Sequence, residues 1–197
     1  MSEERAVSKA DVTRSRLLEA AETAFASKGF HGTTTRDIAS AAGMSPAVLY
    51  VHHNSKEELL YQLSRSGHDE ALRVTLAALA SSDDPVVQLR RFLYDFALHH
   101  ARSHTMSRIA NYELPALSEE HLAEVMVIRR AISRAVRDLI DRGVAAGVFV
   151  VPSPRMAVLA LMSMSIDIAR WYTDDVIDPE DIAAAYADMG VRMLGAH

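Results

Sequence analysis

The chain has 197 residues, of which 49% are hydrophobic and 24% are charged, and it contains no cysteine. The absence of thiols excludes disulfide scaffolds, thiolate metal sites and cysteine nucleophiles. The formal net charge is −5, but residues 1–56 carry seven Lys and Arg against six Asp and Glu, so the negative excess lies in the remainder. Any affinity for nucleic-acid phosphates is therefore expected in the amino-terminal quarter.

The sequence has no segment typical of a signal peptide or of a membrane span. Its opening residues, MSEERAVSKADVTRSR, contain no apolar stretch, and the most apolar window, Met156 to Ile166, is bounded by Arg155 and Asp167. That window is much shorter than the roughly 20 residues needed to cross a bilayer. We therefore expect a cytoplasmic protein with no membrane partner.

The first predicted helix covers residues 13–28, where apolar side chains recur at helical spacing until Gly29 interrupts the pattern. Thr34 then precedes Asp37 by three residues, which is the spacing of a capping box. A second, short helix is expected to start there and to end at Gly43 after about two turns.

A third helix is expected from Ser45, an N-cap residue, because Pro46 follows at the first helical position, where its missing N–H is not needed. This helix extends to about His53. Residues 43–45 then link the second helix to the third, and a three-residue turn with a glycine is typical of a helix-turn-helix motif. The motif is predicted over about residues 34–53.

The rest of the chain also predicts helices, and no segment alternates with period two over enough residues to favour a strand. Ser55 and Glu58 form another capping box, which opens a fourth helix. Breaks that contain proline occur at residues 81–85, 114–115 and 148–154. Further helices are expected near residues 86–102, 104–112, 118–146, 154–173 and 179–194. The fold class is therefore all-α, with a three-helix helix-turn-helix domain over residues 1–57 and a second helical domain over residues 58–197.

Residues 29–60, GFHGTTTRDIASAAGMSPAVLYVHHNSKEELL, together with the helix before them resemble the DNA-binding domain of the tetracycline-repressor (TetR) family. The matching positions are Gly29, Phe30, Thr33, Thr34, Ile38, Ala39, Ala42, Gly43, Ser45, Leu49, Tyr50, His52, Ser55, Lys56 and Glu57. Two positions depart from the family pattern. His53 stands where an aromatic residue is common, and Ala47 stands where glycine is frequent.

The resemblance implies a sequence-specific transcription regulator, a repressor that a small-molecule effector releases from double-stranded operator DNA. The carboxyl-terminal domain would bind the effector and form a homodimer. Residues 169–194 are similar to family members that respond to acyl-coenzyme A thioesters, which makes an acyl-coenzyme A one expected effector. A DNA-binding regulator or activator that needs no ligand is the alternative function.

The expected DNA contacts are of three kinds. Small side chains on the third helix enter the major groove and touch thymine methyl groups, and polar side chains of the second helix and the turn reach base edges or phosphates. The resemblance implies that Tyr50, His52 and Lys56 contact the DNA backbone. Packing or helix termination is the alternative role for Tyr50 and His52, and an ordinary solvated charge for Lys56. The complete set is Thr34, Thr35, Arg36, Ser45, Pro46, Ala47, Val48, Tyr50, His52, His53 and Lys56.

A homodimer is expected because one such motif reads only a few base pairs, so specificity requires two copies about one helical turn of DNA apart. The helix over residues 154–173 is apolar on nearly every side. The resemblance implies that it joins the helix over residues 118–146 in a four-helix bundle between subunits. The alternative is a core helix within one subunit.

Apolar and aromatic residues of the carboxyl-terminal domain are candidates for the lining of an effector cavity, although such a stripe is more often plain core. Arg170 either pairs with Asp167 or, with Arg129, Arg130, Arg134 or Arg137, meets an anionic group of the effector. The candidate ligand-binding residues are Phe96, His99, Met106, Ile109, Tyr112, Met126, Arg130, Met162, Ile166, Arg170 and Trp171.

The sequence offers no motif for catalysis or for cofactor binding. It contains no GxSxG, Walker, GxGxxG or HExxH pattern, so we expect neither an enzyme nor a cofactor. His100 and His104 are four residues apart beside His99, but two ligands on one helix face do not make a metal site, and Asp95 and Glu113 are not placed by the sequence to complete one. No metal is expected.

Overall fold

The computed structural model describes residues 8–174 and 177–196. In this part the helices are α1 (Lys9–Gly32), α2 (Thr35–Ala41), α3 (Pro46–His52), α4 (Lys56–Leu79), α5 (Pro85–Arg102), α6 (His104–Tyr112), the 3₁₀ helix η1 (Leu114–Ala116), α7 (Glu119–Ala145), α8 (Pro154–Trp171) and α9 (Pro179–Met193). The all-α fold class is confirmed. The expected domains 1–57 and 58–197 and the closing region 169–194 also include residues 1–7, 175–176 and 197, which lie outside the described residues.

Helix α1 begins earlier than its apolar pattern predicts, because Ser8 caps it. The Ser8 hydroxyl accepts a hydrogen bond from the Asp11 N–H at 3.1 Å, and the Asp11 carboxylate accepts one from the Ser8 N–H at 3.3 Å. This capping box starts the helix at Lys9. Near the other end, Gly29 adopts φ 67° and ψ 170°, a conformation that favours glycine, and sets the last turn apart from the regular helix.

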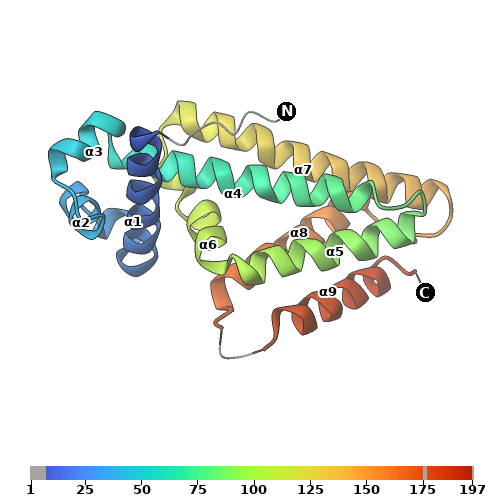
Figure 1. Ribbon diagram of the computed structural model, residues 1–197. Helices are drawn as coiled ribbons and strands as arrows, with labels where there is room; N and C mark the ends of the chain where they lie inside the picture. The colour runs from blue at the N-terminus through green and yellow to red at the C-terminus, as the bar shows by residue number, and fades with distance from the viewer. Residues whose placement is uncertain (1–7, 175–176, 197) are drawn as a thin grey trace, which may run out of the picture.

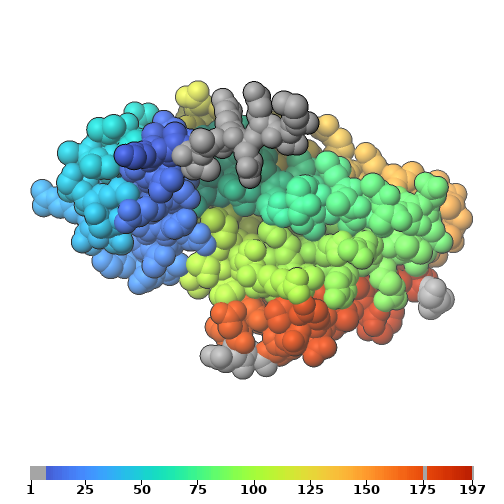
Figure 2. Space-filling model, in the orientation of Figure 1, coloured from blue at the N-terminus to red at the C-terminus, as the bar shows by residue number. Residues whose placement is uncertain are grey.

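Helices α1, α2 and α3 and the start of α4 enclose a hydrophobic core at one end of the elongated molecule (Figures 1 and 2). Each of these helices contributes at least one fully buried side chain to this core. These side chains are at most 2% exposed, and they include Leu17, Phe25, Ile38, Leu49 and Leu59. Side chains from α6 and α7 belong to the same cluster. The amino-terminal helices are therefore packed against the remainder of the chain rather than joined to it by a linker alone.

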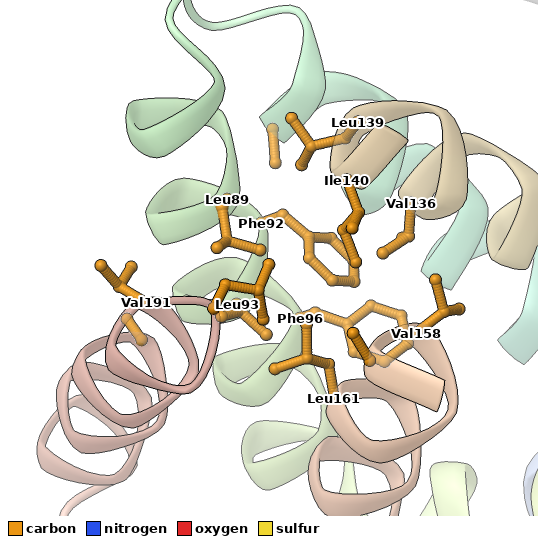
Figure 3. Packing of buried hydrophobic residues seen from close by; sticks show 14 of the residues in the cluster. Leu89, Phe92, Leu93, Phe96, Val136, Leu139, Ile140, Val158, Leu161 and Val191 are labelled. Carbon is orange, nitrogen blue, oxygen red and sulfur yellow. The ribbon is translucent and has the colours of Figure 1, made fainter. Parts of the chain in front are cut away.

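Helix α5 runs through the middle of the carboxyl-terminal helices and contacts α4, α7, α8 and α9 (Figure 1). Its Phe92 and Phe96 rings are buried, with centroids 5.1 Å apart. Figure 3 shows aliphatic side chains of α5, α7, α8 and α9 around both rings. On the outer side, an ion pair between Arg90 and Asp188 also joins α5 to α9. Helix α5 is thus the central element of the second core.

A glycine in α7 allows an aromatic ring to close one end of this core. Phe149 lies in the turn between α7 and α8 and is 2% exposed. A Cβ atom on Gly143 would lie 2.0 Å from the Phe149 ring, a distance that carbon atoms cannot adopt. The ring therefore packs directly on the backbone of α7.

We predict that Gly143→Ala destabilises the protein, although alanine is the better helix former. The gain in helix propensity is at most about 1 kcal/mol, whereas overpacking a core typically costs about 1–3 kcal/mol. The urea midpoint of unfolding is expected to fall. Val144→Ala, at the more exposed neighbouring position, is the control and should change the midpoint little. An equal or higher midpoint for the Gly143 variant would contradict this packing.

Candidate DNA-binding surface and ligand cavity

Helix α2 starts at the capping box that the sequence predicts. Thr34 Oγ1 accepts a hydrogen bond from the Asp37 N–H at 3.2 Å, and the Asp37 carboxylate accepts one from the Thr34 N–H at 2.8 Å. Hydrogen bonds from the Thr34 hydroxyl and N–H, followed by that from Lys28, lower the pKa of Asp37 to about 2. The carboxylate is therefore charged at neutral pH and holds the first turn of α2.

One face of α3 is fixed in the core and the opposite face meets solvent. Leu49 is fully buried, and Gly43, with φ +67°, closes the turn from α2. Arg16 supports this turn by donating a hydrogen bond to the Ala42 carbonyl at 2.8 Å. On the outer face, the side chain of Tyr50 is 56% exposed. The helix is thus held rigidly with its outer face available to a partner.

Most of the expected DNA contacts lie on this outer surface of α2, α3 and their turn. They are exposed or half-buried, and they comprise Thr34, Thr35, Arg36, Ser45, Pro46, Ala47, Val48, Tyr50 and His52. A hydrogen bond of 3.3 Å between Thr35 Oγ1 and the Tyr50 hydroxyl joins α2 to α3. The sequence analysis omitted Val51, which is 79% exposed. Val51 is four residues after Ala47, so both lie on one face of the helix, and this spacing could have predicted its exposure.

Of the two remaining expected contacts, His53 is buried, and Lys56 is half-buried with its ammonium group turned back onto the end of α1. Lys56 Nζ donates hydrogen bonds to the carbonyls of Phe30 and Thr33, both at 2.7 Å, and lies 4.2 Å from the centroid of the Phe30 ring. His53 is 2% exposed, and its Nδ1 lies 3.4 Å from Gln62 Nε2. Burial lowers the pKa of His53, which favours the neutral ring. Lys56 therefore ties α4 to the end of α1, and His53 fills the corner after α3.

A small cavity of about 40 Å³ lies among α4, α5, α6, α7 and α8. Four of the expected ligand-binding residues line it: Phe96, His99, Met162 and Ile166. The others do not. Ile109, Tyr112 and Arg170 line a separate groove beside α1, and Met106, Met126, Arg130 and Trp171 lie outside the cavity wall.

Of the polar cavity wall, the sequence indicated His99 and, among several arginines that could meet an anionic group, Arg129, but not His68 or Asn111. Arg129 Nη1 donates to Asn111 Oδ1 at 2.7 Å and lies 2.8 Å from His68 Nε2. His68 Nδ1 in turn lies 2.7 Å from the Ser64 carbonyl. Burial lowers the pKa of His68 to about 4, so its ring is neutral at pH 7, donates through Nδ1 and accepts through Nε2. These residues come from α4, α6 and α7, and no local sequence pattern brings them together.

Arg170 pairs with Asp167, as one of the two alternatives for it predicts. Arg170 Nε donates to Asp167 Oδ1 at 2.7 Å, and Nη2 donates to Oδ2 at 3.1 Å. The Tyr112 hydroxyl also donates to Asp167, at 3.0 Å. The charge of Arg170 is therefore balanced within the chain.

Family models match both parts of the chain. One, described as bacterial regulatory proteins of the tetR family, matches residues 17–63, and another, described as the C-terminal domain of tetracyclin repressor-like proteins, matches residues 82–194. The chain belongs to the TetR family. The resemblance carried by residues 29–60 is thereby confirmed.

Three relatives illustrate the range of this similarity. The crystal structure of a regulatory protein in the tetR family from Rhodococcus RHA1 is 36% identical, covers 96% of this chain and 99% of that chain, and has a TM-score of 0.90. The HTH-type transcriptional activator FasR of Mycolicibacterium smegmatis is 30% identical and covers 84% of this chain and 74% of its own. AibR, solved in complex with isovaleryl coenzyme A and operator DNA, shares the fold at 23% identity, with a TM-score of 0.82, over 92% of this chain and 97% of its own.

In this TetR-family chain, α6 lies between the cavity and the amino-terminal helices. Ser107 and Asn111 line the cavity. From the same helix, Arg108 Nη2 donates to the Ala26 carbonyl at 3.2 Å, and just after it Glu113 Oε1 accepts a hydrogen bond from the Phe30 N–H at 3.2 Å. A shift of α6 would therefore act directly on the end of α1.

Large apolar side chains are exposed on both α8 and α9. Met156 and Leu159 of α8 are 61% and 50% exposed, and Met189 and Met193 of α9 are 43% and 48% exposed. Helix α7 has one comparable residue away from its last turn, Val127, whose neighbours on the outer surface are mostly charged. Although α8 is so apolar, no described helix has both the length and the hydropathy to span a membrane.

The histidines considered for metal binding are engaged separately. His100 is buried with Nδ1 2.8 Å from the Phe96 carbonyl, and His104 Nδ1 lies 3.2 Å from the Ala101 carbonyl. Within residues 8–174 and 177–196, no group of three or more His, Cys, Asp or Glu side chains has the arrangement to hold a metal ion.

Buried neutral histidines make the stability of the fold depend on pH. Burial lowers the pKa of His68 to about 4 and that of His100 to about 3, below the ordinary 6.5 of an unfolded chain. Below pH 6.5 the unfolded chain therefore binds protons that the folded chain does not, so the stability that is complete above pH 6.5 is lost as the pH falls toward 4. We predict a loss of about 1–2 kcal/mol per histidine between pH 7 and 5.

Urea unfolding at a series of pH values measures this effect. His68→Gln should reduce the slope of stability against pH by about one proton between pH 6 and 5. Val87→Ala, which removes no titratable group, is the control. An unchanged slope for the His68 variant would contradict a neutral, buried His68.

Proposed function

We propose that this chain is a cytoplasmic transcription repressor that binds double-stranded operator DNA through α3 and is released by a small-molecule effector. The rigid, outward face of α3 is the observation that carries the proposal. Leu49 anchors the helix, while small side chains such as Ala47 leave room for it to enter a major groove. The role is regulatory rather than catalytic.

We favour repression over activation of transcription, because the matching family takes its description from a repressor. Activation is the second candidate, because FasR is named as an activator. Transcription from a promoter that contains the operator, with and without the protein, distinguishes the two.

We assign the DNA contacts to the outer surface of α2 and α3. Ala47 and Val51 face thymine methyl groups, and Thr35, Arg36 and Tyr50 reach bases or phosphates. The burial of His53 and the hydrogen bonds of Lys56 to the Phe30 and Thr33 carbonyls support a different role for these two residues, which is to hold the corner between α3 and α4.

We predict that Tyr50→Ala weakens operator binding by about tenfold or more, since a good groove or phosphate contact contributes about 1–3 kcal/mol. Tyr50→Phe keeps the ring and should lose less. A gel-shift titration measures both, and circular dichroism verifies the fold. Operator affinity within twofold of the parent for Tyr50→Ala would refute this role.

Lys56→Gln is the contrasting variant. If Lys56 holds the corner, its loss lowers the urea midpoint and leaves the dependence of operator affinity on salt unchanged. If it binds a phosphate, the slope of log affinity against log salt falls by about one.

We propose that two copies of the chain associate through the exposed face of α8 and α9. Four large apolar side chains there are about half exposed in the single chain, which is unusual for a soluble monomer. The outer surface of α7 is more polar, which supports pairing of α8 with α9 rather than with α7. A dimer would present its two α3 helices to adjacent turns of the DNA.

We predict that Leu159→Arg, which buries a charge in this interface, converts the dimer to a monomer and abolishes operator binding. Sedimentation equilibrium measures the mass. Val127→Arg on α7 is the matched control, because Val127 is 59% exposed but lies off the proposed interface. If Val127→Arg dissociates the dimer and Leu159→Arg does not, the result would instead support a bundle of α7 and α8.

The cavity beside α6 is the proposed effector site. An effector that fits it better in one position of α6 shifts the balance between two arrangements of the amino-terminal helices. The contacts of Arg108 and Glu113 with α1 support this path. AibR was solved with isovaleryl coenzyme A, which supports an acyl group as a candidate occupant.

A further inference from the structure

Arg129 differs from the arginines of this chain that pair with a carboxylate. Arg73, Arg137 and Arg170, for example, are exposed and each pairs with a carboxylate three or four residues away. Arg129 is half-buried, and its partners are the neutral His68 ring and the neutral amide of Asn111. Among the described residues, no carboxylate lies within ion-pair distance of Arg129, and burial lowers its pKa. A desolvated cation without a counter-charge is unfavourable unless an anion joins it.

The guanidinium is oriented but not fully used. Both of its hydrogen bonds leave from Nη1, so the edge formed by Nε and Nη2 has no described partner. Two N–H groups on one edge match the two oxygens of a carboxylate. His68 and Asn111 thus fix the plane of the group without neutralising it.

The surroundings of Arg129 define the rest of the ligand. The inner cavity has apolar walls from Phe96, Ile132, Met162 and Ile166, and no carboxylate lines it. Its volume of about 40 Å³ corresponds to roughly three water molecules, so a short hydrocarbon group fits and a large ring system does not. Arg129 also borders an open cleft of about 510 Å³ beside α8. Asp167 lines this cleft as well, but its carboxylate is paired with Arg170.

We propose that Arg129 binds the carboxylate of a short, otherwise apolar organic acid whose hydrocarbon chain enters the cavity between Phe96 and Met162. The proposal rests on the proposed role of this cavity as the effector site. It names the chemical class of the effector, a small carboxylic acid, and it assigns Arg129 as the residue that selects for charge. Arg170 has no such role, because Asp167 already balances it.

Calorimetric titration of the full-length protein tests the proposal with three forms of the same acyl group. Butanoate, hexanoate and octanoate are compared with their methyl esters and with their coenzyme A thioesters. At least one acid is expected to bind, and its ester at least about tenfold more weakly, because the ester lacks the charge. Binding of the esters or the thioesters with no binding of the acids would overturn the proposal.

Variants then locate the charge recognition. Arg129→Gln should weaken the acid by at least about tenfold and leave the ester unchanged, and Arg129→Lys should recover only part of the loss. Arg130→Gln, an exposed neighbour, is the matched control. Equal acid affinity in Arg129→Gln would overturn the assignment. Because the ester comparison uses the unaltered protein, it decides the question even if a variant does not fold.

Operator binding separates this proposal from the proposed function. If the protein binds its operator and is released by a neutral or thioester ligand but not by an acid, the proposed function stands and the role of Arg129 is refuted. Protein that binds the acid but no DNA refutes the function and leaves the site.

Discussion

The structure depends on α4, a single helix whose buried side chains belong to both hydrophobic cores. Leu59, Leu60 and Leu63 pack in the amino-terminal core, whereas Ala71 and Ala78, further along the same helix, pack in the carboxyl-terminal one. A regular helix transmits displacement because its backbone hydrogen bonds resist bending. The amino-terminal helices therefore cannot move relative to the cavity without moving α4. The proposed effect of the cavity on α3 depends on this constraint.

Helix α6 provides a second connection with a different chemistry. Ile109 is buried in the amino-terminal core, whereas its neighbour Ala110 lines the cavity. The link to α1 is polar, through Arg108 and Glu113, and such hydrogen bonds can break and reform at little net free energy. We infer that α4 supplies stiffness and that α6 supplies the adjustable contact between the two parts.

The features that could be predicted from the sequence depend on interactions between residues close together in the chain. The capping box at Thr34, the proline that follows Ser45 and the turn at Gly43 depend on residues close together in the chain, so the second and third helices were predicted closely. The role of Lys56 could not be predicted, since its partners are backbone carbonyls at residues 30 and 33, whose position depends on how α1 packs. Likewise His68, Asn111 and Arg129 approach one another only when three helices assemble.

The same residues argue against imperfect packing as the origin of the cavity. A core made only of apolar side chains would avoid the desolvation of Arg129 and of the His68 and His100 rings, and such replacements are often neutral or stabilising. In the neighbouring core, apolar side chains of four helices surround the Phe92 ring. Functional sites often contain polar groups that reduce the stability of the fold but are held in a fixed mutual orientation. The arrangement around Arg129 is therefore better explained by binding than by stability.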